Sequence, residues 1–285
     1  MSGAAAAEVV PEAVRDIVAA VAGSPWAATD RSTAEGAAQV TRVDGPQGRL
    51  WVKTHRQART AEQEARALRA AASVGDVPEL HAVAGTCLVM THVDGGLASE
   101  RAAWARAGAW LGRWHAMPVD DDDPMPLIDA VRARAEAWAA RAHRVGAPGL
   151  AGALALTDAE SAALVDAQRV WCHRDYHPRN WLDDGARVGV IDFEHARPDL
   201  AEFDLAKVRA SEADAPLRAA FVDAWTEARG QAPDRVLLAL GDRMHAVVTW
   251  VWGTQRGHAP TIAEGARALA RSGLVVADER SVAGS

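Results

Sequence analysis

Residues 170–199 decide the fold, and they read VWCHRDYHPRNWLDDGARVGVIDFEHARPD. This stretch interrupts a part of the chain that otherwise consists of Ala-rich segments with helical periodicity. Two short strand-forming runs, 181–182 and 188–191, flank the sequence Asp-Asp-Gly, and Asp-Gly is a strong hairpin turn signal. The stretch therefore predicts a β-hairpin set into a helical region.

Oxygen-bearing side chains lie at both ends of this predicted hairpin. Asn180 precedes the first strand and Asp192 follows the second, so closing the hairpin brings both to the same open end, beside Asp175. A hard divalent cation such as Mg²⁺ prefers oxygen ligands and usually completes its octahedron with water and phosphate oxygens. One carboxylate, one amide and a triphosphate would suffice, so these residues predict a magnesium and nucleotide site.

The first part of the chain indicates a small sheet with one main helix. A strand-rich stretch follows an opening helix, and within it the β-leaning runs at 39–43 and 50–53 are separated by the turn-forming sequence DGPQG. One helix is predicted at about 60–72, and another strand pair at 77–83 and 87–90. The predicted order through this part is β-β-β-α-β-β.

The remainder of the chain is mainly helical. The runs 98–117, 127–145 and 158–169 are Ala-rich and have helical periodicity. A chain of 285 residues is expected to form one large or two modest units. We therefore predict an α+β fold with two parts, a small sheet with one main helix in residues 1–92 and a mainly helical part in residues 93–285.

A second set of candidate residues lies on the predicted sheet and its helix. Leu50 and Val52 share one face of their strand, which leaves Lys53 on the other face. On the following helix, Glu64 falls beside the apolar stripe, whereas Glu62 points away from it. An inward glutamate needs a cation, and Lys53 lies on the neighbouring strand. This pair is predicted to direct the lysine ammonium toward phosphate oxygens.

Composition excludes several classes of partner. The chain is 49% hydrophobic and 24% charged, which is ordinary for a globular protein with a real core. Its net charge of -7 is opposite in sign to what nucleic acid or an anionic membrane requires, and it favours a cationic ligand. No uncharged run has the length of a membrane-spanning helix, and the N-terminus lacks a secretory signal. We therefore expect a cytoplasmic protein.

The order of these features resembles the protein-kinase-like superfamily, and more closely its aminoglycoside phosphotransferase and choline kinase branch. The resemblance lies in the strand with Lys53, the helix with Glu64, the connector at 87–93, HRDYHPRN and IDFE. It covers roughly residues 26–206. Glu194 stands where many kinases have glycine. The resemblance implies a two-lobe kinase-like fold, with a nucleotide-binding lobe of residues 1–92 and a lobe of residues 93–285 for catalysis and substrate binding. It also implies an ATP-dependent phosphotransferase that uses Mg²⁺, with GTP as an alternative nucleotide.

The resemblance also implies roles for the residues of the hairpin region. Asp175 would accept or orient the hydroxyl proton of the substrate, and His173 would support the catalytic loop. Asn180 and Asp192 would hold Mg²⁺. Asp204, in the sequence FDLA, matches a structural acid of the family.

The nucleotide-binding residues follow from the same resemblance. Lys53, fixed by Glu64, would contact the ATP phosphates. The main chain of the connector would receive adenine at Thr91, His92 and Val93.

The acceptor is predicted to be a small molecule with a hydroxyl group. The acidic balance of the chain favours an aminoglycoside-type antibiotic, with choline, another amino alcohol or a sugar as the alternative. Glu212 and Asp214 lie where the antibiotic-modifying branch often places acids for cationic substrates. The alternative interpretation is that both are ordinary solvated acids. Trp225, Trp250 and Trp252 fall in the part expected to shape the acceptor cleft, and core packing is the competing and favoured role for Trp250 and Trp252.

Two other functional classes stay open at this point. A nucleotide-binding pseudokinase would share the fold, but all the catalytic residue types are present, which argues against it. A metallohydrolase would use His173, Asp175, His177 and His195 as ligands, and it predicts a tightly held transition metal. His177 and His195 are otherwise interpreted as structural histidines or substrate contacts.

Overall fold

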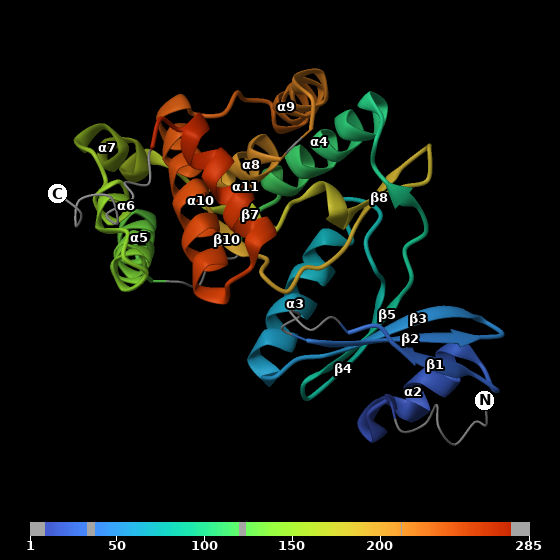
Figure 1. Cartoon of the computed structure of the whole chain (residues 1–285). Helices are drawn as coiled ribbons and strands as arrows, with labels where there is room; N and C mark the ends of the chain where they lie inside the picture. Colours follow the sequence, from blue (N-terminus) through green and yellow to red (C-terminus); the bar gives the residue numbers. More distant parts are fainter. Residues whose placement is uncertain (1–8, 33–37, 120–123, 212, 275–285) are drawn as a thin grey trace.

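Figure 1 shows a sheet with two helices on one side of the molecule and a group of helices on the other. The structure is a computed structural model of the chain, and it describes residues 9–32, 38–119, 124–211 and 213–274. The predicted α+β, two-lobe kinase-like fold class is confirmed. The division between residues 92 and 93 stays a prediction.

The sheet has five antiparallel strands in the order β1-β2-β3-β5-β4. The strands are β1 (Ala27–Asp30), β2 (Gln39–Gly45), β3 (Gly48–Thr54), β4 (Leu80–Ala84) and β5 (Cys87–Thr91). Because side chains alternate along β3, Leu50 and Val52 pack with helix α2 (Glu12–Ala22) on one face. Lys53 lies on the opposite face, toward α3 (Ala58–Ala71). The predicted strand and helix order is confirmed.

Within the helical part, residues 170–199 form short paired strands. The hairpin β8 (Trp181–Asp183) and β9 (Val188–Val190) is joined by β6 (Gly96–Leu97), and β7 (Val170–Cys172) pairs with β10 (Arg197–Asp199). The longer helices are α4 (Arg101–Ala116), α5 (Leu127–Arg144), α7 (Asp158–Asp166), α8 (Ala201–Ala210), α9 (Ala215–Arg229), α10 (Arg235–Arg256) and α11 (Ala259–Arg271), and α6 (Pro148–Gly152) is a single turn. Within the described residues, no helix is both long and apolar enough to cross a membrane.

An aromatic core lies directly beneath the hairpin region. Tyr176 stacks on Trp110 with ring centroids 5.9 Å apart, and its hydroxyl donates to the Ala107 carbonyl oxygen at 2.8 Å. Trp181 stacks on Phe221 at 5.3 Å. These rings are fully or almost fully buried, so the segment between β7 and β9 rests on a rigid base.

Candidate active site

The hairpin predicted at the centre of the site is present. β8 pairs with β9, and the Ile191 N–H donates to the Asn180 carbonyl oxygen at 3.1 Å. Asn180 and Asp192 therefore lie at the same open end. Asn180 Nδ2 donates to Asp175 twice, at 2.9 Å to the main-chain oxygen and at 3.1 Å to Oδ2. Asp192 is close enough to Asp175 for the two carboxylates to repel each other. The structure therefore brings together the three side chains that the sequence predicted to meet.

Two residues of this region hold strained main-chain conformations. Arg174 has a φ of 64° and Asp192 a φ of 69°, and no other non-glycine residue in the described ranges has a positive φ. Such conformations cost about 1–3 kcal/mol each and persist only where the surroundings impose them. The strain therefore marks the two short segments that carry the predicted aspartates.

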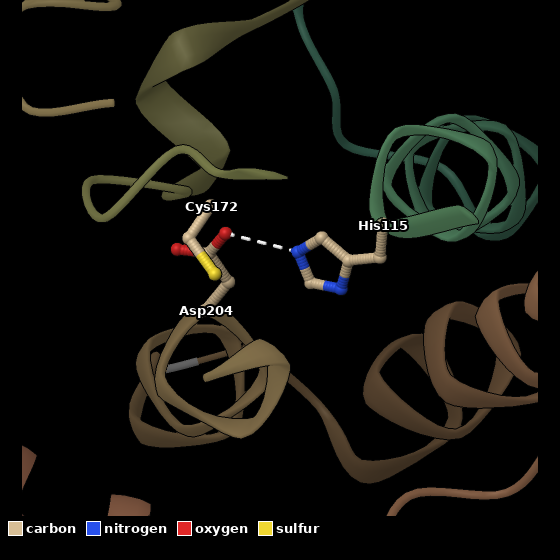
Figure 2. Close-up of side chains that lie close together, drawn as sticks. All are labelled: His115, Cys172 and Asp204. Carbon is tan, nitrogen blue, oxygen red and sulfur yellow. Dashed lines mark hydrogen bonds and ion pairs between the residues drawn. The ribbon is translucent and has the colours of Figure 1, made fainter. Parts of the chain in front are cut away.

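Asp204, in the first turn of α8, holds the loop that carries Asp175. Its Oδ1 accepts the Arg174 N–H at 2.6 Å, and its Oδ2 accepts the His173 N–H at 2.8 Å. Oδ2 also accepts a hydrogen bond from His115 Nε2 at 3.1 Å, which Figure 2 shows crossing from α4 to α8. The carboxylate is fully buried. It therefore supplies the constraint that keeps the strained loop in place.

The three buried side chains in Figure 2, His115, Cys172 and Asp204, form a structural anchor. Trp225 Nε1 donates to His115 Nδ1 at 3.1 Å, so the histidine carries its proton on Nε2, and burial lowers its pKa. The Cys172 thiol donates to the Leu200 carbonyl oxygen at 3.3 Å, and burial raises the pKa of that thiol. The ligand atoms of this histidine, the cysteine and Asp204 lie within 4.8 Å of one another. Their hydrogen bonds to the loop and core already satisfy them.

We expect Asp204→Ala to destabilise the protein by about 3–5 kcal/mol, because two loop N–H groups and a buried histidine lose a charged acceptor. Urea denaturation at pH 7 measures this loss. Glu227→Gln removes an exposed acid from α9 and serves as the control, with an expected change within about 0.5 kcal/mol. Equal unfolding free energies for the two variants would show that Asp204 does not anchor the loop.

Lys53 lies among three carboxylates. Its Nζ is 3.1 Å from Glu64 Oε1, 2.6 Å from Asp192 Oδ1 and 3.1 Å from Glu194 Oε2. The predicted contact with Glu64 is therefore present, and Glu62 is exposed as expected. His55 Nε2 lies 2.7 Å from the other Glu64 oxygen. Lys53 is 5% and Glu64 1% exposed, so this is a buried ion cluster and not a surface pair.

The charges of this cluster do not balance. Burial by itself lowers the pKa of Lys53, but Glu64, Asp192 and Glu194 together raise it above its usual value, so the lysine is charged. Burial raises the pKa of Asp192, and the ion pair with Lys53 outweighs that effect and lowers it. Three carboxylates then surround one ammonium, and the excess negative charge favours a further cation at this position.

A cavity of about 270 Å³ joins the candidate residues from both parts of the fold. Its lining includes all the residues predicted to bind nucleotide or metal: Lys53, Glu64, Thr91, His92, Val93, Asn180 and Asp192. Apolar side chains of the sheet and hairpin form the rest of its walls, among them Val40, Met90, Leu182 and Ile191. The cavity is therefore apolar at its walls and charged at one end.

The connector at one edge of this cavity has only part of its main chain available to a ligand. The Thr91 N–H donates to the Glu79 carbonyl oxygen at 2.9 Å, and the His92 N–H to that of Arg49 at 3.1 Å. The His92 side chain accepts a hydrogen bond from Trp51 Nε1 at 3.0 Å. Of the three predicted adenine contacts, the Val93 main chain is therefore the one whose N–H is not used by these bonds.

The ligand set of the metallohydrolase alternative does not assemble. His173 Nε2 donates to the Ile191 carbonyl oxygen at 3.0 Å, and Nδ1 accepts the Asp175 N–H at 3.3 Å. His177 Nδ1 accepts the N–H of Arg179 at 3.2 Å. The groupings of possible ligand atoms in the described part of the chain include neither His177 nor His195. His173 instead braces the loop, as predicted.

The residues predicted to line an acceptor cleft lie in different settings. Trp225 is fully buried and bonded to His115, so its predicted place in a cleft is wrong. Trp250 of α10 packs against α11. Trp252 is half-buried, and the Arg256 guanidinium lies over its ring. Asp214 is exposed at the start of α9, and Glu212 lies outside the described residues. Acceptor contacts of Asp214, Trp250 and Trp252 stay predictions.

Two residues of the site escaped sequence reasoning. Glu194 is the third carboxylate on Lys53, and Lys207 of α8 makes an ion pair with Asp175 Oδ1. A compositional signal was available for Lys207, because the chain has 29 arginines and only two lysines, Lys53 and Lys207.

The fold and the site together define a class of protein, a kinase-like phosphotransferase with a buried lysine–glutamate pair and a loop of the form HxDxxxxN followed by DFE. The sequence model described as Phosphotransferase enzyme family matches residues 29–238, which is most of the chain. The chain therefore belongs to the phosphotransferase enzyme family. It is an enzyme that transfers a phosphoryl group to an alcohol acceptor.

Solved structures with similar folds include kinases of several substrates. The macrolide 2′-phosphotransferase MphH from Brachybacterium faecium is 18% identical, with a TM-score of 0.61 over 91% of this chain and 98% of that chain. The choline kinase LicA from Streptococcus pneumoniae is 12% identical, with a TM-score of 0.67 over 91% and 97%. The ADP-bound aminoglycoside phosphotransferase APH(2″)-Ib is 13% identical, with a TM-score of 0.65 over 93% and 100%. A comparison with curated proteins finds no match.

Proposed function

We propose that this protein transfers the γ-phosphoryl group of ATP, bound with Mg²⁺, to a hydroxyl group of a small molecule. An aminoglycoside-type antibiotic is the first acceptor to test. The observation that carries it is the single cavity at which Lys53 and Glu64 of the sheet and its helix meet Asn180 and Asp192 of the hairpin.

The nucleotide would lie in this cavity with its base between the apolar walls and its phosphates at the charged end. The Val93 main chain is available to the adenine edge, and Lys53 is available to the phosphates. Lys53 is held from behind by Glu64, itself held by His55, so its ammonium does not need to be ordered when the nucleotide arrives. Such preorganisation lets a charged group act at full strength on developing negative charge.

The hairpin residues fit a divalent cation by the chemistry of their donors. Asn180 directs its Nδ2 to Asp175, which leaves its Oδ1 for a metal. Asp192 binds Lys53 through Oδ1, which leaves Oδ2. One amide oxygen, one carboxylate oxygen and the excess negative charge beside Lys53 suit Mg²⁺. The ion would neutralise charge on the phosphate oxygens during transfer.

Asp175 would orient the acceptor hydroxyl for in-line attack. Burial raises the pKa of this carboxyl, but the adjacent Lys207 lowers it below the usual value. Asp175 is therefore ionised throughout the neutral pH range and can accept a hydrogen bond from the hydroxyl. Phosphoryl transfer depends mainly on positioning and charge neutralisation, so an aspartate of low basicity is adequate.

Charges in and around the site bear on the identity of the acceptor. The net charge of -7 and the exposed Asp214 support a polycation such as an aminoglycoside. Lys207 beside Asp175 favours the second candidate, a sugar or another acceptor without a positive charge next to the reacting hydroxyl, because like charges repel at short range.

The direct test is ATP turnover with a panel of aminoglycosides, macrolides, choline, amino alcohols and sugars. Mass spectrometry of any hit should show one added phosphate, and wild-type protein without any phosphorylated product across the panel would contradict the proposal. A product with sugars but not with aminoglycosides would reject the antibiotic assignment and keep the enzyme class.

Metal dependence gives a separate prediction. Chelation should abolish turnover and Mg²⁺ should restore it, whereas Asn180→Ala should raise the Mg²⁺ concentration needed for half-maximal rate by about tenfold or more. Titration of Mg²⁺ against rate measures both effects. Asp166→Ala removes an exposed acid at the end of α7 and should leave the titration unchanged. An Asn180→Ala curve identical to that of the wild type would remove Asn180 from the metal site.

A further inference from the structure

The two lysines of the chain both lie in the site. Lys53 contacts Asp192, and Lys207 contacts Asp175. The chain also contains a single asparagine, Asn180, which is bonded to Asp175. Against 29 arginines elsewhere, these positions are the ones where the sequence uses an ammonium or an asparagine amide. Lys53 and Asn180 have places in the proposed chemistry, and Lys207 has none so far.

One turn of α8 organises the loop that carries Asp175. Asp204 holds the main chain of His173 and Arg174, and Lys207, three residues later on the same helix, holds the Asp175 side chain. Residues three apart on a helix share a face. The main chain of the loop and its functional carboxylate are therefore oriented by the same rigid element.

The Asp175 carboxylate is held at both of its oxygens. Lys207 binds Oδ1 and Asn180 binds Oδ2. An ionised carboxylate offers about four acceptor sites, so room for one further hydrogen bond from a hydroxyl remains. Lys207 is 24% and Asp175 30% exposed, so a ligand can approach the pair from solvent.

We propose that Lys207 is a positioning residue of the phosphotransfer site, which fixes the direction of the Asp175 carboxylate while one of its acceptor sites stays open for the substrate hydroxyl. This inference rests on the proposed function and adds a residue from a distant helix to it.

An arginine would not serve equally well at this position. A guanidinium binds a carboxylate through two parallel N–H groups and covers both oxygens, whereas an ammonium acts as a point charge on one. At Asp175 the bidentate arrangement would compete with Asn180 and with the hydroxyl. This difference gives a physical reason for a lysine in a chain that otherwise uses arginine.

The ion pair itself can be tested without any activity. Full-length protein labelled with ¹³C-lysine should give two ε-methylene signals, which the variant Lys207→Arg assigns by loss of one. Asp175→Asn should shift the Lys207 signal and leave the Lys53 signal in place. If the Lys207 signal is the same in the wild type and in Asp175→Asn, the pair does not exist and the inference is overturned.

Kinetics test the role of the pair. With Mg-ATP and the best acceptor of the panel, Lys207→Met should lower kcat about 100-fold and leave ADP affinity within twofold. Lys207→Arg keeps a cation at this position and should lower kcat only about tenfold.

The matched control is Arg209→Met. Arg209 lies two residues later on α8 and pairs with Asp242 at an exposed position, so the variant removes a cation from the same helix away from Asp175. It should keep the wild-type kcat. A Lys207→Met enzyme with kcat within twofold of the wild type from pH 5 to pH 9 would overturn the positioning role. If the wild type transfers no phosphate, the proposed function is wrong, and the lysine spectra alone decide the pair.

Discussion

Asp175→Asn should lower kcat by about 10³-fold or more, while the dissociation constant of Mg-ADP stays within about twofold. The substitution keeps the size of the side chain and its contact with Asn180, but it removes the negative charge that would orient the acceptor hydroxyl. Because the neutral amide no longer attracts Lys207, the loss includes the fixed direction of the side chain as well as its charge.

The measurement is single-turnover transfer at saturating Mg-ATP and acceptor, with ADP affinity determined by calorimetry. Asp166→Asn changes an exposed aspartate at the end of α7 in the same chemical way and should keep the wild-type rate. A kcat for Asp175→Asn within tenfold of the wild type would show that another group orients the hydroxyl.

Lys53→Met should lower kcat/KM for ATP by about 10²–10³-fold, because a preorganised cation on the phosphates is lost. It should also destabilise the protein by about 3–5 kcal/mol at pH 7, since Glu64, Asp192 and Glu194 stay in place without their shared partner. The same substitution is therefore expected to change both kcat/KM for ATP and the free energy of unfolding strongly.

The stability effect has a defined pH dependence. The lowered pKa of Asp192 in the wild type comes from Lys53 outweighing burial, so this pair contributes stability above the ordinary carboxyl pKa and loses it as pH falls through the lowered value. In Lys53→Met, Asp192 lacks this cation and takes up a proton more readily. The difference in unfolding free energy between the two proteins should therefore be largest near pH 7 and shrink below about pH 5.

A double variant separates the two effects of Lys53. Lys53→Met combined with Glu64→Gln removes the most deeply buried of the three carboxylates that lose Lys53, so it should recover part of the lost stability. It should recover none of the lost kcat/KM for ATP, because no cation is restored. Recovery of activity in the double variant would mean that Lys53 acts only through folding.

Much of the site could be predicted because its residues are related by local geometry. The phase of the β3 strand put Lys53 on the face opposite Leu50 and Val52, and helical periodicity separated Glu64 from Glu62. The Asp-Gly turn determined which residues end the hairpin, so the meeting of Asn180 and Asp192 followed from a short segment.

The residues that sequence reasoning missed or misplaced depend on the packing of distant elements. Lys207 reaches Asp175 only because α8 lies against the loop through Asp204. Trp225 was expected near a cleft, but α9 packs along α4 and buries it against His115. The periodicity of α8 and α9 could not predict either contact, because periodicity indicates which face of a helix is buried and not which partner covers that face.

The sequence by itself determined the class of fold, the hairpin with Asn180 and Asp192 at its open end, and the inward lysine and glutamate, because alternation, helical phase and turn chemistry act over a few residues. Only the tertiary structure decided that three carboxylates share Lys53 and that Lys207 holds Asp175. These contacts join segments far apart in the chain, and their charges interact strongly only after packing has removed the water between them.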